Sequence, residues 1–305
     1  MNGTEIITFL SNNFPTIMTP IKSVIGGLLG AIFLRHNTAT EEFEKIKAGQ
    51  FREAADDLLK SGKMTYTEYY KANNFLIVAE KADEYYSKTH HESNSTTYDF
   101  DWFIRFYEAV GSISDEAMQD LWAKILAGEI VEPSSFSLKT IDTLRNMSKK
   151  NAELFVKICN HSFMVKVESD SIFLPNNDSY LDECDIQYFD IMKLNEQGLI
   201  FNDSAISLNI PINKEPAILF TNNELIMTIA AVDNTESLAR IRQYPFTEAG
   251  RELASVIAGN ASDDDFINYG RCLDKENANY NIAVYKCIKW NENSVNHELK
   301  NLIFD

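Results

Sequence analysis

The stretch Asp99–Leu144 decides the fold class of the chain; it reads DFDWFIRFYEAVGSISDEAMQDLWAKILAGEIVEPSSFSLKTIDTL. Its apolar side chains recur at the three- and four-residue spacing of amphipathic helices. Turns at Gly111 and Pro133 divide the stretch, which predicts three consecutive helices. We expect Asp99 to cap the first helix and Ser114 to cap the second, and we expect the third to cover about residues 138–147.

The same helical pattern extends to both sides of this stretch. Upstream, Thr65 and Glu68 match a capping box, which predicts a helix that reaches about Lys88. A further helix is expected from Thr40 to about residue 61, because acidic residues stand in its first turn. Downstream, Ser148 is expected to cap a helix that ends near residue 161. The sequence therefore predicts an all-helical domain at residues 40–161.

After His161 the pattern changes to short alternating runs, and the order helix–helix–hairpin within residues 178–258 resembles a winged helix. We expect an α+β winged-helix-like domain at residues 162–305, so the fold class is mainly α with a C-terminal α+β part. The expected elements are strands at 163–168 and 171–174, one or two helices within 180–197, a hairpin of 199–201 with 205–210, a strand at 224–232, a helix at 247–258, an acidic loop at 260–265 and a strand at 283–290.

Residues 1–39 form an apolar N-terminal arm that contains the uncharged run SVIGGLLGAIFL between Lys22 and Arg35. Its small residues follow a small-x-x-x-small pattern, which lets helix backbones approach closely. The run is shorter than the roughly 20 residues of a membrane-spanning helix. Packing on the chain's own fold, oligomer contact and conditional membrane insertion all stay open. The candidate oligomer or membrane segment comprises Val24, Ile25, Gly26, Gly27, Leu28, Leu29, Gly30, Ala31, Ile32, Phe33 and Leu34.

The chain of 305 residues is acidic, with 45 Asp and Glu against 28 Lys and Arg and a formal charge of −17. Recognition of nucleic acid needs a basic surface, so nucleic acid is not an expected partner. The winged-helix-like part has the same bias, because residues 175–200 contain six acids and the single base Lys193. We therefore expect this part to dock protein or to serve as a structural module.

Cysteine and histidine patterns predict neither disulfides nor a metal site. The four cysteines are widely spaced and form no C-x-x-C pair, as in a reducing compartment. The adjacent His90 and His91 lack further ligands at zinc spacing. Cys159 lies near His161, but its apolar helix position predicts a buried, inert thiol. The N-terminus has no basic residue before residue 9, so we expect no secretory signal and a cytoplasmic protein, membrane-associated on activation of the arm.

Catalytic motifs are not found in the sequence. Neither a phosphate-binding loop nor a G-x-S-x-G elbow is present. Glu298 and Lys300 fit part of a metal-nuclease pattern, but no convincing strand aspartate precedes them. We expect a protein that is not an enzyme and has no cofactor, with no catalytic residue to name.

The block W-A-K-I-L-A-G-E at residues 122–129, followed by P-S-S-F-S-L-K-T at residues 133–140, resembles a bacterial family of unknown function. The same helical block is distantly similar to the abortive-infection alpha group, which implies a role in bacterial defence against phage. The resemblance carries over no catalytic residues. The candidate functional residues of the block are Trp122, Gly128, Glu129, Pro133, Phe136 and Lys139; of these, Trp122 is expected in the core and Glu129 and Lys139 at the surface.

Together these observations favour a non-enzymatic anti-phage protein. It would sense a phage component, with a phage protein as the expected trigger, and act as a homo-oligomer with possible membrane disruption by the arm. Two other hypotheses remain: a winged-helix regulator that binds nucleic acid, and a nuclease effector with an unrecognised carboxylate site.

Overall fold

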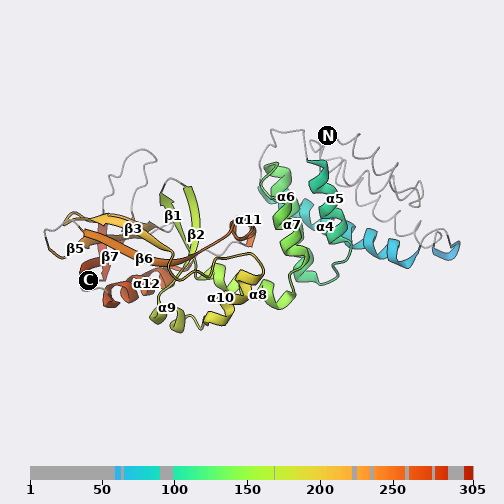
Figure 1. The fold of residues 1–305 in the computed structure, drawn as a ribbon. Coiled ribbons are helices and arrows are strands. Elements are labelled where there is room, and N and C mark those ends of the chain that lie inside the picture. Colours follow the sequence, from blue (N-terminus) through green and yellow to red (C-terminus); the bar gives the residue numbers. More distant parts are fainter. Residues whose placement is uncertain are drawn as a thin grey trace. The chain divides into compact units, whose positions relative to one another are not determined.

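A computed structural model describes residues 59–62, 65–89, 99–167, 169–221, 225–233, 237–257, 261–276, 279–287 and 299–304. The chain divides into two compact units, residues 1–146 and residues 147–305, and each is described by itself (Figure 1). The apolar arm, its candidate segment 24–34 and nearly all of the helix expected at 40–61 lie outside the described residues. Within the described part of the chain, no helix combines the length and apolarity needed to cross a membrane.

The N-terminal unit is helical, and its caps explain where the helices begin. Thr65 and Glu68 form the expected capping box, since each backbone N–H is bound by the other's side chain. Asp99 caps the next helix as predicted, but Asp115, not Ser114, caps the one after it. Both residues suit the cap position, and local sequence does not choose between neighbours. The helices are α4 (Tyr66–Thr89), α5 (Phe100–Val110), α6 (Glu116–Val131) and α7 (Leu138–Arg145).

An aromatic core joins these helices. The ring of Phe106 stacks on Trp102, with centroids 5.1 Å apart, and meets Trp122 edge-on at 5.4 Å. From α4, Phe75 contacts both α5 rings Phe103 and Tyr107. Aromatic pairs in these geometries add to the stabilisation from apolar burial. The periodic apolar face that predicts the helices is therefore the face that forms this core.

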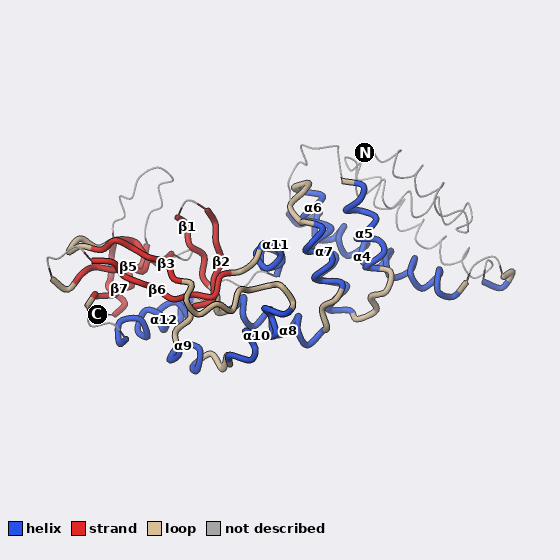
Figure 2. The backbone as a smooth tube through the Cα atoms, in the orientation of Figure 1, coloured by secondary structure: helices blue, strands red, loops and turns tan. Residues whose placement is uncertain are grey.

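The C-terminal unit begins with helix α8 (Lys149–Asn160), which Ser148 caps as predicted and which packs against α10 and α11. All strands of the described residues belong to this unit (Figure 2). Its other helices are α9 (Asp178–Glu183), α10 (Tyr188–Glu196), α11 (Glu248–Ile257) and α12 (Asp263–Glu276), and its strands are β1 (Phe163–Val167), β2 (Ser169–Pro175), β3 (Ser207–Ile212), β4 (Ala217–Thr221), β5 (Leu225–Ala231), β6 (Ser237–Pro245), β7 (Tyr280–Cys287) and β8 (Leu299–Phe304).

These strands form two four-stranded antiparallel sheets, in the orders β1-β2-β6-β3 and β4-β5-β7-β8. The hairpin expected between residues 199–201 and 205–210 is wrong. Both segments pair with the neighbourhood of β6 instead, through an Ile200–Phe246 bridge and through β3. The polar turn between them hid this longer-range pairing. The described chain is helix-rich, and its C-terminal part contains small antiparallel sheets. The winged helix stays a prediction.

Two close contacts fix the centre of the C-terminal unit. Phe173 of one sheet and Phe220 of the other lie 4.9 Å apart between ring centroids. Gly250 of α11 packs directly on the backbone of Leu199, where an added Cβ would lie 2.0 Å from the carbonyl oxygen. No side chain larger than hydrogen fits at that distance, so the backbone crossing depends on glycine.

A helix stands where the sequence predicted an acidic loop. Ser262 and Asp265 form a reciprocal capping box at the start of α12, with Ser262 N–H and Oγ donating to the aspartate and Asp265 N–H donating to the serine. The three consecutive acids at 263–265 therefore occupy the first turn of a helix, where the helix dipole favours negative charge.

A candidate polar pocket between β6 and α12

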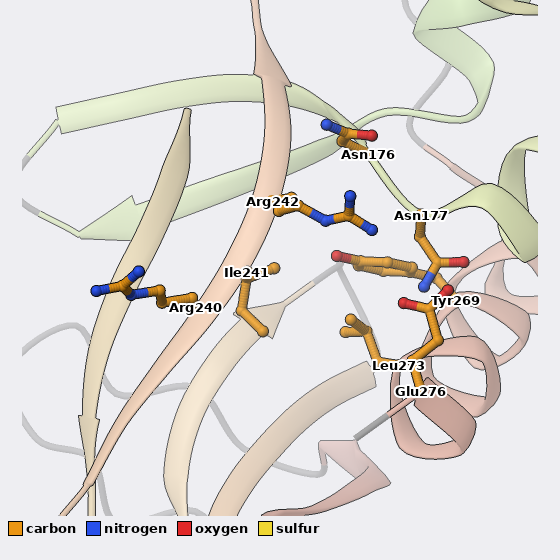
Figure 3. A pocket seen from close by; sticks show the side chains of 8 residues that line it. All are labelled: Asn176, Asn177, Arg240, Ile241, Arg242, Tyr269, Leu273 and Glu276. Atoms are coloured by element: carbon orange, nitrogen blue, oxygen red, sulfur yellow. The ribbon is translucent and has the colours of Figure 1, made fainter. Parts of the chain in front are cut away.

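A cavity of about 290 Å³ opens between β6 and α12 in the C-terminal unit. Three segments supply its walls: strand β6, the turn between β2 and α9, and the last turns of α12 (Figure 3). The lining residues are Asn176, Asn177, Arg240, Ile241, Arg242, Tyr269, Leu273 and Glu276.

The alternation of β6 places the two arginines of the pocket. Arg240 and Arg242 are two residues apart and exposed, whereas Ile241 between them and Ala239 before them are buried. Successive side chains of a strand point to opposite faces of the sheet, so Arg240 and Arg242 lie on the same face. The backbone N–H of Asn176 donates to the carbonyl of Arg242 at 3.2 Å, which fixes the asparagine turn beside the strand.

Asn177 is 2% exposed and is only half used by the fold. Its Oδ1 accepts from the backbone N–H of Tyr180 at 2.9 Å and so caps α9. Its Nδ2 has no hydrogen-bond partner among the residues that the structure describes. A buried amide donor without a partner costs free energy, and this donor belongs to a pocket-lining side chain.

Tyr269 forms the floor of the pocket and is completely buried. Burial raises the pKa of its hydroxyl well above the ordinary value, so the phenol stays protonated. That hydroxyl likewise lacks a hydrogen-bond partner within the described part of the chain. In Figure 3 the guanidinium of Arg242 lies over the hydroxyl end of the ring, with Asn177 on its other side.

The charges at the rim are unequal. Two arginines and one acid, Glu276, line the pocket, in a chain that carries a net charge of −17. Desolvation raises the pKa of the Glu276 carboxyl, the positive charge of Arg242 lowers it, and Asp178 raises it further. Removal of the carboxyl from water is therefore the largest of these effects, even though its side chain reaches the rim.

The pocket combines neutral donors on its floor with cationic donors at its rim. An asparagine amide, a phenol and guanidinium groups all hydrogen-bond to oxygen anions, and arginine matches the planar fork of a carboxylate or phosphate. This donor set is chemically suited to an anionic group.

The residues of the family block are structural in the described geometry. Trp122 is fully buried, as predicted, and Phe136 is 3% exposed. Gly128 and Pro133 are half-buried, and Lys139 is exposed. The surface position expected for Glu129 is wrong, because its side chain is 2% exposed.

Glu129 is buried because it closes the turn between α6 and α7. Its Oε1 accepts from the backbone N–H of Ser134 at 2.7 Å, and its Oε2 accepts from the N–H of Phe136 at 3.2 Å. Ser134 has a positive φ of 71°, which is uncommon outside glycine. The carboxylate thus satisfies the donors of a tight turn, a function that a helical pattern does not reveal.

The pocket residues were not identified from the sequence. Tyr269, Leu273 and Glu276 stand on α12, and the sequence predicted an acidic loop at the start of this helix. The Ser262–Asp265 spacing is the signal that could have located this helix. The burial predicted for Cys159 is confirmed, and this burial raises the pKa of its thiol.

The chain belongs to the family described as protein of unknown function (DUF2806), whose profile matches residues 63–270. The matched range includes both the helical block and most of the pocket residues. No match was found among curated proteins or among solved structures.

Proposed function

We propose that this protein is a non-enzymatic sensor whose C-terminal unit binds a carboxylate or phosphate group in the pocket between β6 and α12. The observation that carries the proposal is the unpaired Nδ2 donor of the buried Asn177 at this pocket. The unpaired hydroxyl of Tyr269 and the rim arginines support it. An oxygen anion is an acceptor for each of these kinds of donor.

The setting that we propose is bacterial defence against phage, with a phage protein as the trigger. The resemblance of the block 122–140 to the abortive-infection alpha group supports this setting. An acidic side chain of such a trigger would supply the carboxylate. In the same proposal the chain acts as a homo-oligomer, and the arm at residues 1–39 makes conditional contact with a membrane.

Binding can be tested on the full chain with small anions. The probes are glutamate, succinate and inorganic phosphate, and choline chloride at equal ionic strength is the cationic control. Binding is monitored by NMR. We expect the anions to shift the signals of Asn177 and Tyr269. Arg242→Gln should weaken binding roughly tenfold or more, as for loss of a charge-assisted hydrogen bond.

A matched control separates site from charge. Lys214→Gln removes one positive charge from an exposed loop position outside the pocket. If both variants bind the anions equally well, or if choline gives the same shifts, the pocket is not an anion site. Preference for phosphate over carboxylate would remove the acidic side chain as the recognised group.

The defence role needs a separate test in infected bacteria. Cells expressing the full chain, Arg242→Gln, Gly26→Leu/Gly30→Leu or a chain without residues 1–39 are compared for phage yield and membrane potential. We expect the full chain alone to lower phage yield. Equal yields with the full chain and with an empty vector, over a broad phage panel, would overturn the defence proposal while leaving anion binding intact.

A further inference from the structure

Three potential metal ligands converge at a second place in the C-terminal unit. His161 follows α8, Cys184 follows α9 and Asp265 lies in the first turn of α12. One ligand atom from each of the three lies within 4.8 Å of the other two. They are far apart in sequence, which is why ligand spacing predicted no metal site.

Two of these side chains are already held in place. Nδ1 of His161 lies 2.9 Å from Oδ1 of Asp265. The other carboxylate oxygen of Asp265 accepts from the backbone N–H and the hydroxyl of Ser262. The capping box of α12 thus turns Oδ1 toward the imidazole. The two bonds from Ser262 can persist when Asp265 binds a metal, so this ligand loses less freedom on binding, whereas the Nδ1–Oδ1 hydrogen bond is exchanged for bonds to the ion.

The third ligand is anchored through a tyrosine. The hydroxyl of Tyr180 donates to the carbonyl of His161 at 3.2 Å, and it also interacts with the thiol of Cys184. The same tyrosine thereby ties the segment that carries the histidine to the segment that carries the cysteine. Cys184 is buried, whereas His161 and Asp265 keep about a fifth of their side chains exposed, 23% and 22%. The cluster is therefore reachable from solvent on one side.

We propose that His161, Cys184 and Asp265 bind a single Zn²⁺ ion and leave its fourth position open. Thiolate, imidazole and carboxylate together are the donor set of zinc, while Mg²⁺ and Ca²⁺ prefer oxygen ligands alone. Tetrahedral zinc with bonds of about 2.0–2.3 Å holds its donors about 3.5 Å apart. No two of the ligand atoms are more than 4.8 Å apart, so the longer separations need to close by about 1.3 Å at most, and the 2.9 Å His161–Asp265 pair needs to open slightly.

The step balances in protons. Burial raises the pKa of the Cys184 thiol to about 11, so the metal-free protein holds a neutral thiol there. Zinc binding forms a Zn–S bond, breaks the S–H bond and releases one proton to solvent. The ion would replace that proton and leave the carboxylate of Asp265 as its second negative ligand.

Such an ion would also stabilise the wall of the polar pocket. Asn177 caps the helix that Cys184 follows, and Tyr269 stands on the helix whose first turn contains Asp265. Zinc would join these two helices to each other and to the end of α8. The metal proposal does not depend on anion binding, because the two sites share no residue.

The test uses the full chain freed of metal by a chelator and titrated with Co²⁺ and Zn²⁺. We expect one Co²⁺ per chain, a thiolate-to-cobalt charge-transfer band, and displacement of cobalt by zinc. Cys184→Ser should abolish the band, and Asp265→Asn should weaken affinity roughly tenfold or more, since even residues that only orient ligands cost 10–100-fold.

Cys272→Ala is the matched control, because it removes another buried cysteine from α12, the helix of Asp265, and keeps all three members of the cluster. It should keep the band, and circular dichroism should show that each variant is folded. The proposal is overturned if the folded wild type binds no stoichiometric cobalt, or if Cys184→Ser keeps the band. A band lost in Cys272→Ala but kept in Cys184→Ser would equally reject it.

Discussion

The two units each bury a polar side chain in a turn beside a helix, and they treat it differently. In the N-terminal unit, both oxygens of Glu129 accept hydrogen bonds from the backbone of the turn at Ser134 and Phe136. In the C-terminal unit, Asn177 uses its oxygen to cap α9 but leaves its amide nitrogen unpaired among the described residues. The first side chain completes a fold, and the second leaves a donor for something else.

The surroundings of the unpaired groups decide what they mean. The indole N–H groups of Trp102 and Trp122 also lack partners in the described part of the chain, but their rings are packed with Phe106 in an aromatic core. Tyr269 also packs against aromatic rings, among them Phe163 and Tyr180, but it and Asn177 line a cavity of about 290 Å³ with arginines at its rim. An unpaired donor is evidence for a ligand where space and complementary charge accompany it.

Each unit is expected to have its own core, and Gly250→Ala should disrupt the core of the C-terminal unit with the largest effect of the variants proposed. The new methyl group would meet the carbonyl oxygen of Leu199 at 2.0 Å, so the backbones must separate. We expect a loss of about 4 kcal/mol or more in the stability of the C-terminal unit. Hydrogen exchange measured during urea unfolding should show early exchange in residues 147–305 and little change in the exchange of α4 to α7.

Gly62→Ala is the control, since the position has a positive φ of 69° and no atom within 4 Å of an added Cβ. It should cost about 1 kcal/mol, from backbone strain alone. Equal losses in the two variants would show that the backbone crossing at Gly250 accommodates a methyl group. Loss of protection in both units with Gly250→Ala would show that the two cores are not separate.

Glu129→Ala tests the paired side of the comparison. Removal of the carboxylate leaves the N–H groups of Ser134 and Phe136 without their acceptor. We expect the free energy of unfolding of the N-terminal unit to fall by about 2–3 kcal/mol. Lys139→Ala, an exposed change in the same block, should stay within about 0.5 kcal/mol. A neutral Glu129→Ala would mean that the turn holds without its acceptor.

Asn177→Ser tests the unpaired side. Serine keeps an oxygen that can cap α9 but removes the free amide donor. We expect a change in stability below about 1 kcal/mol and a loss of roughly tenfold in affinity for small anions. Thermal unfolding and NMR titration of the same sample measure both quantities. A large loss of stability with unchanged anion affinity would show that the amide serves the fold after all.

Local signals in the sequence were enough to locate the helices of the N-terminal unit and α8. The capping box of Thr65 and Glu68, the cap at Asp99 and the cap at Ser148 all mark helix starts that the structure confirms. Each signal needs only three or four neighbouring residues. The apolar periodicity of the same helices identified their buried faces, including Trp122.

What sequence reasoning missed depends on contacts between distant residues. The pairing of β3 with β6 joins Ser207 to Arg242 across an insertion that contains β4 and β5. The pocket likewise joins Asn177 to Tyr269. Periodicity reports which face of an element is buried but not which segment covers it. The burial of Glu129 was not predicted either. Its partners, Ser134 and Phe136, are near in sequence, but periodicity does not show that the turn folds back onto the carboxylate.

The smallest effect is the pH dependence that Glu129 itself contributes. Burial raises the pKa of its carboxyl, although hydrogen bonds from Ser134, Phe136 and Ser135 oppose the shift. The folded chain therefore holds this proton to a higher pH than the unfolded chain, whose carboxyl titrates near its ordinary value of about 4.3. Between these two pKa values, the contribution of Glu129 to the free energy of unfolding falls as pH rises.

Glu129→Gln removes this titration but keeps the size of the side chain. We expect the variant to be less stable overall, because its amide accepts at one oxygen only, and to lose less stability than the wild type as pH rises through the window above 4.3. The difference in slope should stay below about 1.4 kcal/mol per pH unit, the limit for one proton. Urea unfolding of the N-terminal helices at a series of pH values measures it. Parallel curves of unfolding free energy against pH would contradict the prediction. They would show that the hydrogen bonds of the turn cancel the effect of burial on the pKa of Glu129.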